Sequence, residues 1–212
     1  MEENISSKMN HSVKRLVFLC LGLIIMAFGV AFSIKAGLGT SPISSVPYVT
    51  SEISGLSVGT TTIIMNFIFV LMQIAILWKQ YDWFQLLQFP AAILFGTAID
   101  LAQRIIHPIM CSSYFQQWIF CILGTFLIAF GVSLEVNADL VTTPGEGVVL
   151  SICKITPIKF GNMKMLFDII LVCISIVLSF LFLGELSGVR EGTIAAAVFV
   201  GQITKQTNKL FH

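Results

Sequence analysis

Two consecutive hydroxyl residues precede a proline at two places in the sequence, in the runs Thr40–Pro42 and Thr142–Pro144. A hydroxyl residue followed by proline is typical of a helix start, with the hydroxyl at the N-cap and the proline at the first helical position. The N-terminal end of a helix carries unpaired N–H groups and a partial positive charge, and broken helices in transporters use such ends to hold anions. We therefore predict a binding site at these two helix starts.

The two helix starts belong to an internal duplication. The run Ala27–Pro42, AFGVAFSIKAGLGTSP, returns 102 residues later as Ala129–Pro144, AFGVSLEVNADLVTTP. The same offset aligns Gly22 with Gly124. Apolar composition alone would align leucines by chance, but it would not bring several glycines and a proline into register. We infer that the chain consists of two related halves.

One acidic residue lies deep inside an apolar segment. Asp168 is about two helical turns into its segment, and Asn66 occupies the equivalent position of the first half. Ionisable groups inside a membrane segment are costly, so they are functional candidates by default. Lys164 lies one turn before Asp168, which leaves a structural ion pair as the alternative explanation.

The two helix starts differ in charge. Glu135, Asp139 and Glu146 surround the second, whereas Lys35 is the charged residue near the first. A site between the two halves would therefore face both signs of charge. The predicted substrate-binding residues are Thr40, Ser41, Ser44, Ser45, Asn66, Thr142, Thr143, Glu146 and Asp168.

No catalytic or metal-binding pattern accompanies these groups. The histidines, His11, His107 and His212, lie far apart in the sequence, and no two have the spacing of zinc ligands. A serine nucleophile would need a base nearby, and none is evident. We therefore expect neither an enzyme, nor a metal site, nor a cofactor.

The composition places the chain in a lipid bilayer. Hydrophobic residues make up 56% of the sequence and charged residues 11%, and the apolar runs are long enough to cross about 30 Å of hydrocarbon. The 212 residues allow roughly six to eight spans and no soluble domain. The net charge is +1 and the basic residues are scattered, so nucleic acid is not an expected partner.

Each half is predicted to contain one short polar helix among longer apolar ones. Pro42–Ser54 is too short and too polar to face lipid, so it must face protein or a water-filled cavity. Pro90 is a candidate kink in the helix that closes the first half. The predicted helices are residues 13–34, 42–54, 60–78 and 84–104, followed by 115–136, 145–155, 161–182 and 192–205.

The fold class is therefore an all-α polytopic membrane protein with an internal duplication. Two arrangements are open: three full spans plus one short polar helix in each half, which makes the repeats inverted, or four spans in each half, which makes them parallel. The positive-inside rule does not distinguish them. The turn after the first short helix carries Glu52, whereas its counterpart carries Lys154 and Lys159. This contrast favours inverted repeats.

The predicted organisation is a cytoplasmic tail at residues 1–12, a first repeat at 13–104, a linker at 105–114 and a second repeat at 115–212. The tail is expected to be irregular. Lys8, Lys14 and Arg15 are expected to hold the N-terminus in the cytoplasm. The expected location is a bacterial plasma membrane, with multiple spans and both termini cytoplasmic.

Three sequence features together resemble the YczE/YyaS/YitT-like group of bacterial integral membrane proteins. They are the run KAGLGTSPISSVPY, the Gly-x-Ser-x-Gly turn that leads into a helix with Asn66, and the late run with Gly192, Thr193, Ala197 and Gly201. The resemblance spans the whole chain, and it implies an integral membrane protein without assigning catalytic residues. The second half of the chain departs from this pattern, because Asp139 and Val141 replace the glycines Gly37 and Gly39 of the first half.

The leading functional hypothesis is a small secondary transporter for a small molecule or an ion, with its site between the two helix starts near mid-membrane. The alternative is a non-transporting membrane protein that assembles with or regulates a partner, in which the glycine faces mediate association and a homo-oligomer is expected.

Overall fold

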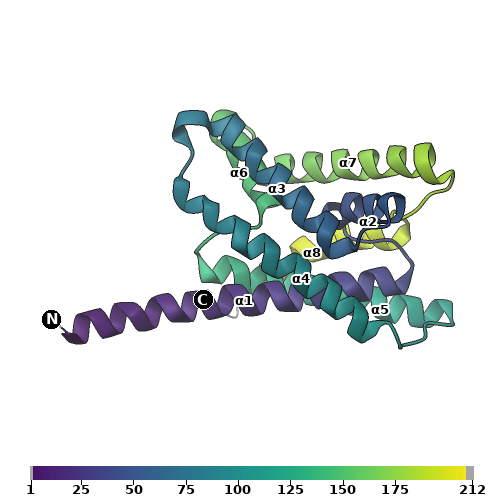
Figure 1. Cartoon of the computed structure of the whole chain (residues 1–212), viewed down its shortest axis with the longest axis horizontal. Helices are drawn as coiled ribbons and strands as arrows, with labels where there is room; N and C mark the ends of the chain where they lie inside the picture. Colours follow the sequence, from purple (N-terminus) through teal and green to yellow (C-terminus); the bar gives the residue numbers. More distant parts are fainter. Residues whose placement is uncertain (1, 209–212) are drawn as a thin grey trace.

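The structure is a computed structural model that describes the backbone of residues 2–208 and the side chains of residues 13–204, 206 and 207. All regular structure in this part of the chain is helical (Figure 1). The main helices are α1 (Glu2–Ala36), α2 (Pro42–Ser54), α3 (Val58–Leu77), α4 (Gln88–Ile106), α5 (Tyr114–Ala138), α6 (Pro144–Ile155), α7 (Phe160–Leu178) and α8 (Glu191–Asn208). Short segments η1 (Trp78–Gln80) and η2 (Trp83–Leu87) precede α4, and η3 (Ser179–Leu183) follows α7.

Five segments of the described chain are long and apolar enough to cross a membrane: Val13–Ala36, Val58–Gln80, Trp83–Ile106, Tyr114–Ala138 and Phe160–Leu183. This agrees with five of the six predicted spans. The sixth, α8, has 18 residues and contains polar side chains such as Gln202 and Gln206, so its composition is less apolar. Exposed apolar side chains on the long helices, for example Phe67 on α3 and Ile169 on α7, suit contact with lipid.

Two predicted boundaries and one predicted kink are corrected by the structure. Helix α1 begins at Glu2 rather than near Val13, because no proline or glycine interrupts the tail, which was expected to be irregular. Helix α4 ends at Ile106, two residues into the predicted linker. Pro90 lies in the first turn of α4, where backbone N–H groups have no acceptor within the helix. The proline therefore breaks no helical hydrogen bond and does not kink the helix.

Helices α1 and α5 form the centre of the fold, and glycines allow their backbones to touch. A Cβ atom at Gly22 would lie 2.8 Å from the carbonyl oxygen of Gly131, and one at Gly29 would lie 2.8 Å from that of Gly124. Small residues permit this close approach between membrane helices. Residue numbers rise along α1 where they fall along α5, so the two helices are antiparallel.

The remaining helices pack on this central pair in a reciprocal way. Helix α4 packs on α1, and α8 packs on α5. The short helix α2 packs on α7, and the short helix α6 packs on α3. Figure 1 shows α6 near the middle of the long axis of the molecule and α2 to its right. The close packing of α3 on α4 has no equal counterpart between α7 and α8 among the described residues.

The chain bends between α1 and α2 and between α5 and α6 with the same backbone conformation at equivalent residues. Gly37 has a φ of 67° and Asp139 a φ of 46°, both in the left-handed region. Aspartate tolerates this region better than most residues, which explains how it replaces the glycine. An arginine donates to the carbonyl oxygen of each: Arg190 to Gly37 at 3.0 Å, and Arg15 to Asp139.

Candidate functional site

A cavity of about 610 Å³ lies between the two halves, and both short helices begin at its wall. Helices α1, α3, α4, α5, α7 and α8 supply most of the rest of the lining. Seven of the nine predicted site residues line it: Ser41, Ser44, Asn66, Thr142, Thr143, Glu146 and Asp168. Apolar side chains such as Val30 and Phe69 form most of the remaining wall. The cavity therefore combines an apolar body with a few polar groups, as small-molecule sites do.

Residues at equivalent positions of the two halves line this cavity together. Ser41 and Thr143, Asn66 and Asp168, and several further lining residues are separated by 102 positions, the offset of the duplication. The further pairs are Met26 with Ile128, Val30 with Val132, Ser44 with Glu146, and Thr62 with Lys164. A cavity lined in this way lies where a two-fold relation between the halves would place it.

The hydroxyls at the two helix starts do not cap their own helices. Ser41 and Thr143 occupy the N-cap positions with proline next, as predicted, but neither side chain accepts a hydrogen bond from its helix. Ser41 instead donates to the hydroxyl oxygen of Ser44 at 3.1 Å. The first-turn N–H groups of α2 are thus left without a side-chain cap, which keeps the positive end of its dipole available.

Two predicted residues lie outside the cavity lining. The backbone N–H of Thr40 donates to the carbonyl oxygen of Gly188 at 3.0 Å, and its hydroxyl donates to the same oxygen at 3.3 Å. Ser45 is fully buried and donates to the carbonyl oxygen of Pro42 at 2.7 Å. Lys35, expected near the first helix start, points elsewhere and donates to the carbonyl oxygen of His107 at 3.0 Å. These polar groups hold the fold together.

The charges in the cavity are unevenly paired. Lys164 and Asp168 form an ion pair at 2.5 Å one helical turn apart on α7, which is the structural contact that the spacing allowed. Glu146 lies in the first turn of α6 and forms no ion pair among the described residues. The lining therefore carries one carboxylate in excess.

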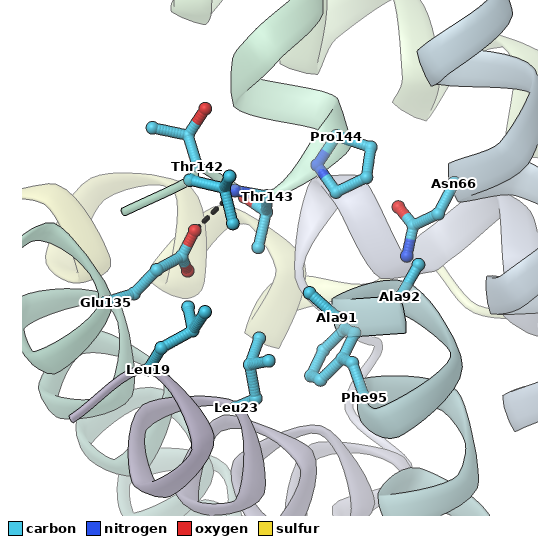
Figure 2. Close-up of a pocket in the computed structure, with 11 residues that line it drawn as sticks. Leu19, Leu23, Asn66, Ala91, Ala92, Phe95, Glu135, Thr142, Thr143 and Pro144 are labelled. Atoms are coloured by element: carbon cyan, nitrogen blue, oxygen red, sulfur yellow. Dashed lines mark hydrogen bonds between the residues drawn. The ribbon is translucent and has the colours of Figure 1, made fainter. Parts of the chain in front are cut away.

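Sequence reasoning did not select Glu135 as a site residue, although it lies beside the second helix start. Its side chain is 2% exposed, and one carboxylate oxygen accepts a hydrogen bond from the backbone N–H of Thr143. Figure 2 draws a smaller pocket beside this carboxyl group. It shows the carboxyl group pointing toward Thr142 and Thr143, with Asn66 on the other side of that pocket. The signal available in the sequence was an acidic residue near the end of an apolar helix, eight positions before Thr143.

The two helix starts are electrostatically different as a result. Helix α2 has no acidic residue in its first turn, so its positive end is not neutralised locally. Helix α6 has Glu146 in its first turn and Glu135 bonded to Thr143 at its N-cap. The start of α2 therefore favours a negative group, and the start of α6 favours a positive group.

Comparison with known proteins places the chain in a family. Residues 13–209 match the profile of a family of unknown function, DUF6198. The chain is 28% identical over 133 residues to the uncharacterised protein YyaS of Bacillus subtilis (strain 168), covering 62% of this chain and 65% of that protein. It is 32% identical over 145 residues to YczE, an uncharacterised membrane protein of the same organism, covering 68% of this chain and 65% of that protein.

The chain thus spans slightly less than two thirds of the length of each of these relatives. No solved structure matches it. The family profile covers nearly the whole chain, and the resemblance to YczE and YyaS that the sequence motifs predicted is confirmed. This multi-pass membrane protein belongs to the DUF6198 family.

Proposed function

We propose that the protein is a carrier built from two oppositely oriented copies of one four-helix unit, and that the cavity between the copies binds a small zwitterion with an apolar body. The observation that carries this proposal is the cavity wall, to which both halves contribute residues at equivalent positions. Secondary transporters with inverted repeats bind substrate at such an interface, at the starts of broken helices.

The antiparallel contact between α1 and α5 supports opposite orientation of the halves. If both helices cross the membrane, the chain makes an odd number of crossings from the start of α1 to the start of α5. Helices α1, α3 and α4 supply three, which leaves the short α2 as a helix that enters and returns. The reciprocal packing of α2 on α7 and of α6 on α3 fits the same two-fold relation. Both termini then lie on one side, which we assign to the cytoplasm of a bacterial plasma membrane.

The charge distribution supports a zwitterionic substrate. A carboxylate group would lie near the start of α2, where Ser41 and Ser44 add hydroxyls to an uncapped helix end. An ammonium group would lie near Glu146, whose carboxylate has no ion-pair partner among the described side chains. The apolar wall beside these two groups would hold an aliphatic or aromatic body.

The alternative of an assembly or regulatory protein lacks comparable support. Its predicted basis was a set of glycine faces free to bind a partner. The glycines in question, Gly22, Gly29, Gly124 and Gly131, are all used within the chain at the contact between α1 and α5.

The Glu146→Gln variant tests this proposal. Purified protein in proteoliposomes loaded with unlabelled leucine is expected to accumulate external radiolabelled leucine by exchange. The variant should lower that uptake by about tenfold or more at low leucine concentration, because it removes the buried partner of the ammonium group.

The matched control is Asp82→Asn, which makes the same acid-to-amide change at an exposed residue before η2 and should leave uptake unchanged. Phenylalanine and glycine serve as larger and smaller probes. If none of the three amino acids enters wild-type proteoliposomes faster than protein-free liposomes, the proposed substrate class is wrong.

A further inference from the structure

Glu135 is a buried carboxyl group whose hydrogen bonding is incomplete. It lies on α5 with 2% of its surface exposed. One of its oxygens accepts the backbone N–H of Thr143, and the other, Oε2, has no hydrogen-bond partner in the described part of the chain. Leaving a buried carboxylate oxygen unpaired is costly, and such groups are rare unless they have a function.

Among the side chains that the structure describes, no positively charged one forms an ion pair with this group. The nearest basic residue of α1, Arg15, donates to the carbonyl oxygen of Ala138 at 2.7 Å and pairs with Asp139. On α6 the facing charge is Glu146, and on α7 Lys164 is already paired with Asp168. Helix α8 brings Thr204 and Thr207 to this part of α5. Its described ionisable residue, Glu191, lies near Tyr114 at the opposite end of α5. Helices α3 and α4 bring Asn66 and apolar residues.

A small second cavity adjoins the carboxyl group. It measures about 10 Å³, which is room for one water molecule. Its wall is mostly apolar, formed in part by Leu19 and Leu23 of α1 and by Phe95 of α4 (Figure 2). Glu135 is the one carboxylate among the described residues of this wall, and no group of three His, Cys, Asp or Glu side chains that could hold a metal ion is found among them. A proton neutralises a carboxylate without any ligand shell.

The small cavity and the substrate cavity have walls in common. Asn66, Phe95, Thr142 and Thr143 line both. The backbone of Thr143 also links Glu135 directly to the start of α6, the helix that carries Glu146 in its first turn. A change in charge at Glu146 therefore alters the electrostatic potential at Glu135, because little water lies between the two groups to screen it.

We propose that Glu135 is a proton-binding site linked to the substrate cavity. With the cavity empty, Oε2 carries a proton. When the ammonium group of a substrate pairs with Glu146, the local potential becomes more positive, and Glu135 releases that proton to a water molecule in the cavity. One O–H bond breaks at Glu135 and one forms on the water, and the carboxylate keeps its hydrogen bond from Thr143. The inference rests on the proposed carrier function, to which it adds exchange with a proton.

The test uses the wild-type protein in proteoliposomes and dicyclohexylcarbodiimide, an apolar reagent that adds to protonated carboxyl groups. The acid adds across one C=N bond of the reagent and rearranges to a stable acylurea, so no atom leaves and mass spectrometry locates the adduct. We expect an adduct at Glu135. Its yield should fall as the pH is raised from about 5 to about 9, by about tenfold per pH unit once the group is mostly ionised. Glu191, whose side chain is 40% exposed, serves as the internal reference.

Two results would overturn the inference: no adduct at Glu135 across this range, or an adduct yield that does not change with pH. The carrier proposal is tested separately by leucine exchange in the same proteoliposomes. Leucine exchange without a Glu135 adduct would contradict the proposed proton site but not the proposed carrier. A pH-dependent adduct without leucine exchange would contradict the carrier but not the proton site. In exchange-competent protein, Glu135→Gln should make leucine uptake independent of pH, and Glu135→Asp should restore the dependence.

Discussion

Gly29→Ala is expected to destabilise the protein by about 1–3 kcal/mol or more, the range for overpacking a close contact. The added Cβ would lie 2.7 Å from the backbone nitrogen of Ile128 and 2.8 Å from the carbonyl oxygen of Gly124. Backbone atoms cannot rotate away as side chains do, so α1 and α5 would have to separate. The melting temperature of the detergent-solubilised protein, followed by the loss of monodisperse protein on size exclusion after heating, measures the effect.

Gly161→Ala provides the matched control for this change. Gly161 is also helical, near the start of α7, and a Cβ atom there would meet nothing within 4 Å. Alanine favours a helix more than glycine, so this variant should be as stable as the wild type or slightly more stable. Equal melting temperatures for the two variants would show that the central crossing is not as close as described.

Ser44→Phe is expected to abolish leucine exchange while leaving the protein folded. Ser44 lies on the cavity wall with 8% of its surface exposed, and its hydroxyl contacts only that of Ser41. A phenyl ring at this position would extend into the cavity and occupy space that the substrate needs. The ring meets an apolar wall there, so the change fills the binding site more than it disturbs packing.

The comparison for Ser44→Phe is the same substitution at Ser54, an exposed residue at the end of the same helix. Ser54→Phe should exchange leucine at the wild-type rate. If Ser44→Phe remains monodisperse and still exchanges leucine normally, the route of the substrate lies elsewhere.

Much of the fold could be predicted because the signals are local and repeated. The proline after each hydroxyl marks the starts of α2 and α6 at the residues where the structure has them. The apolar runs indicated the spans, and Gly22 and Gly124, which the duplication aligns, both lie at the contact between α1 and α5. The offset of the duplication also paired Asn66 with Asp168, and the structure places both on one cavity wall.

The failures concern the orientation of side chains and contacts between distant segments. Thr40 and Ser45 are next to cavity residues in the sequence. Ser45 follows Ser44 on α2, where a shift of one residue turns a side chain by about 100°, whereas Thr40 lies before the helix. Their hydroxyls point at backbone oxygens instead. The isolation of Glu135 depends on which groups α1, α4 and α6 bring to it, and no local pattern contains that information.

The opposite orientation of the two halves is the claim on which the carrier proposal depends most directly. It is measured with single cysteines at equivalent loops, Lys79→Cys after α3 and Glu185→Cys after α7, in a protein whose five native cysteines are replaced. A membrane-impermeant maleimide is applied to intact cells and then to permeabilised cells. The account predicts that the cysteine at 185 reacts in intact cells and that the one at 79 reacts only after permeabilisation. Labelling of both from the same side would contradict it.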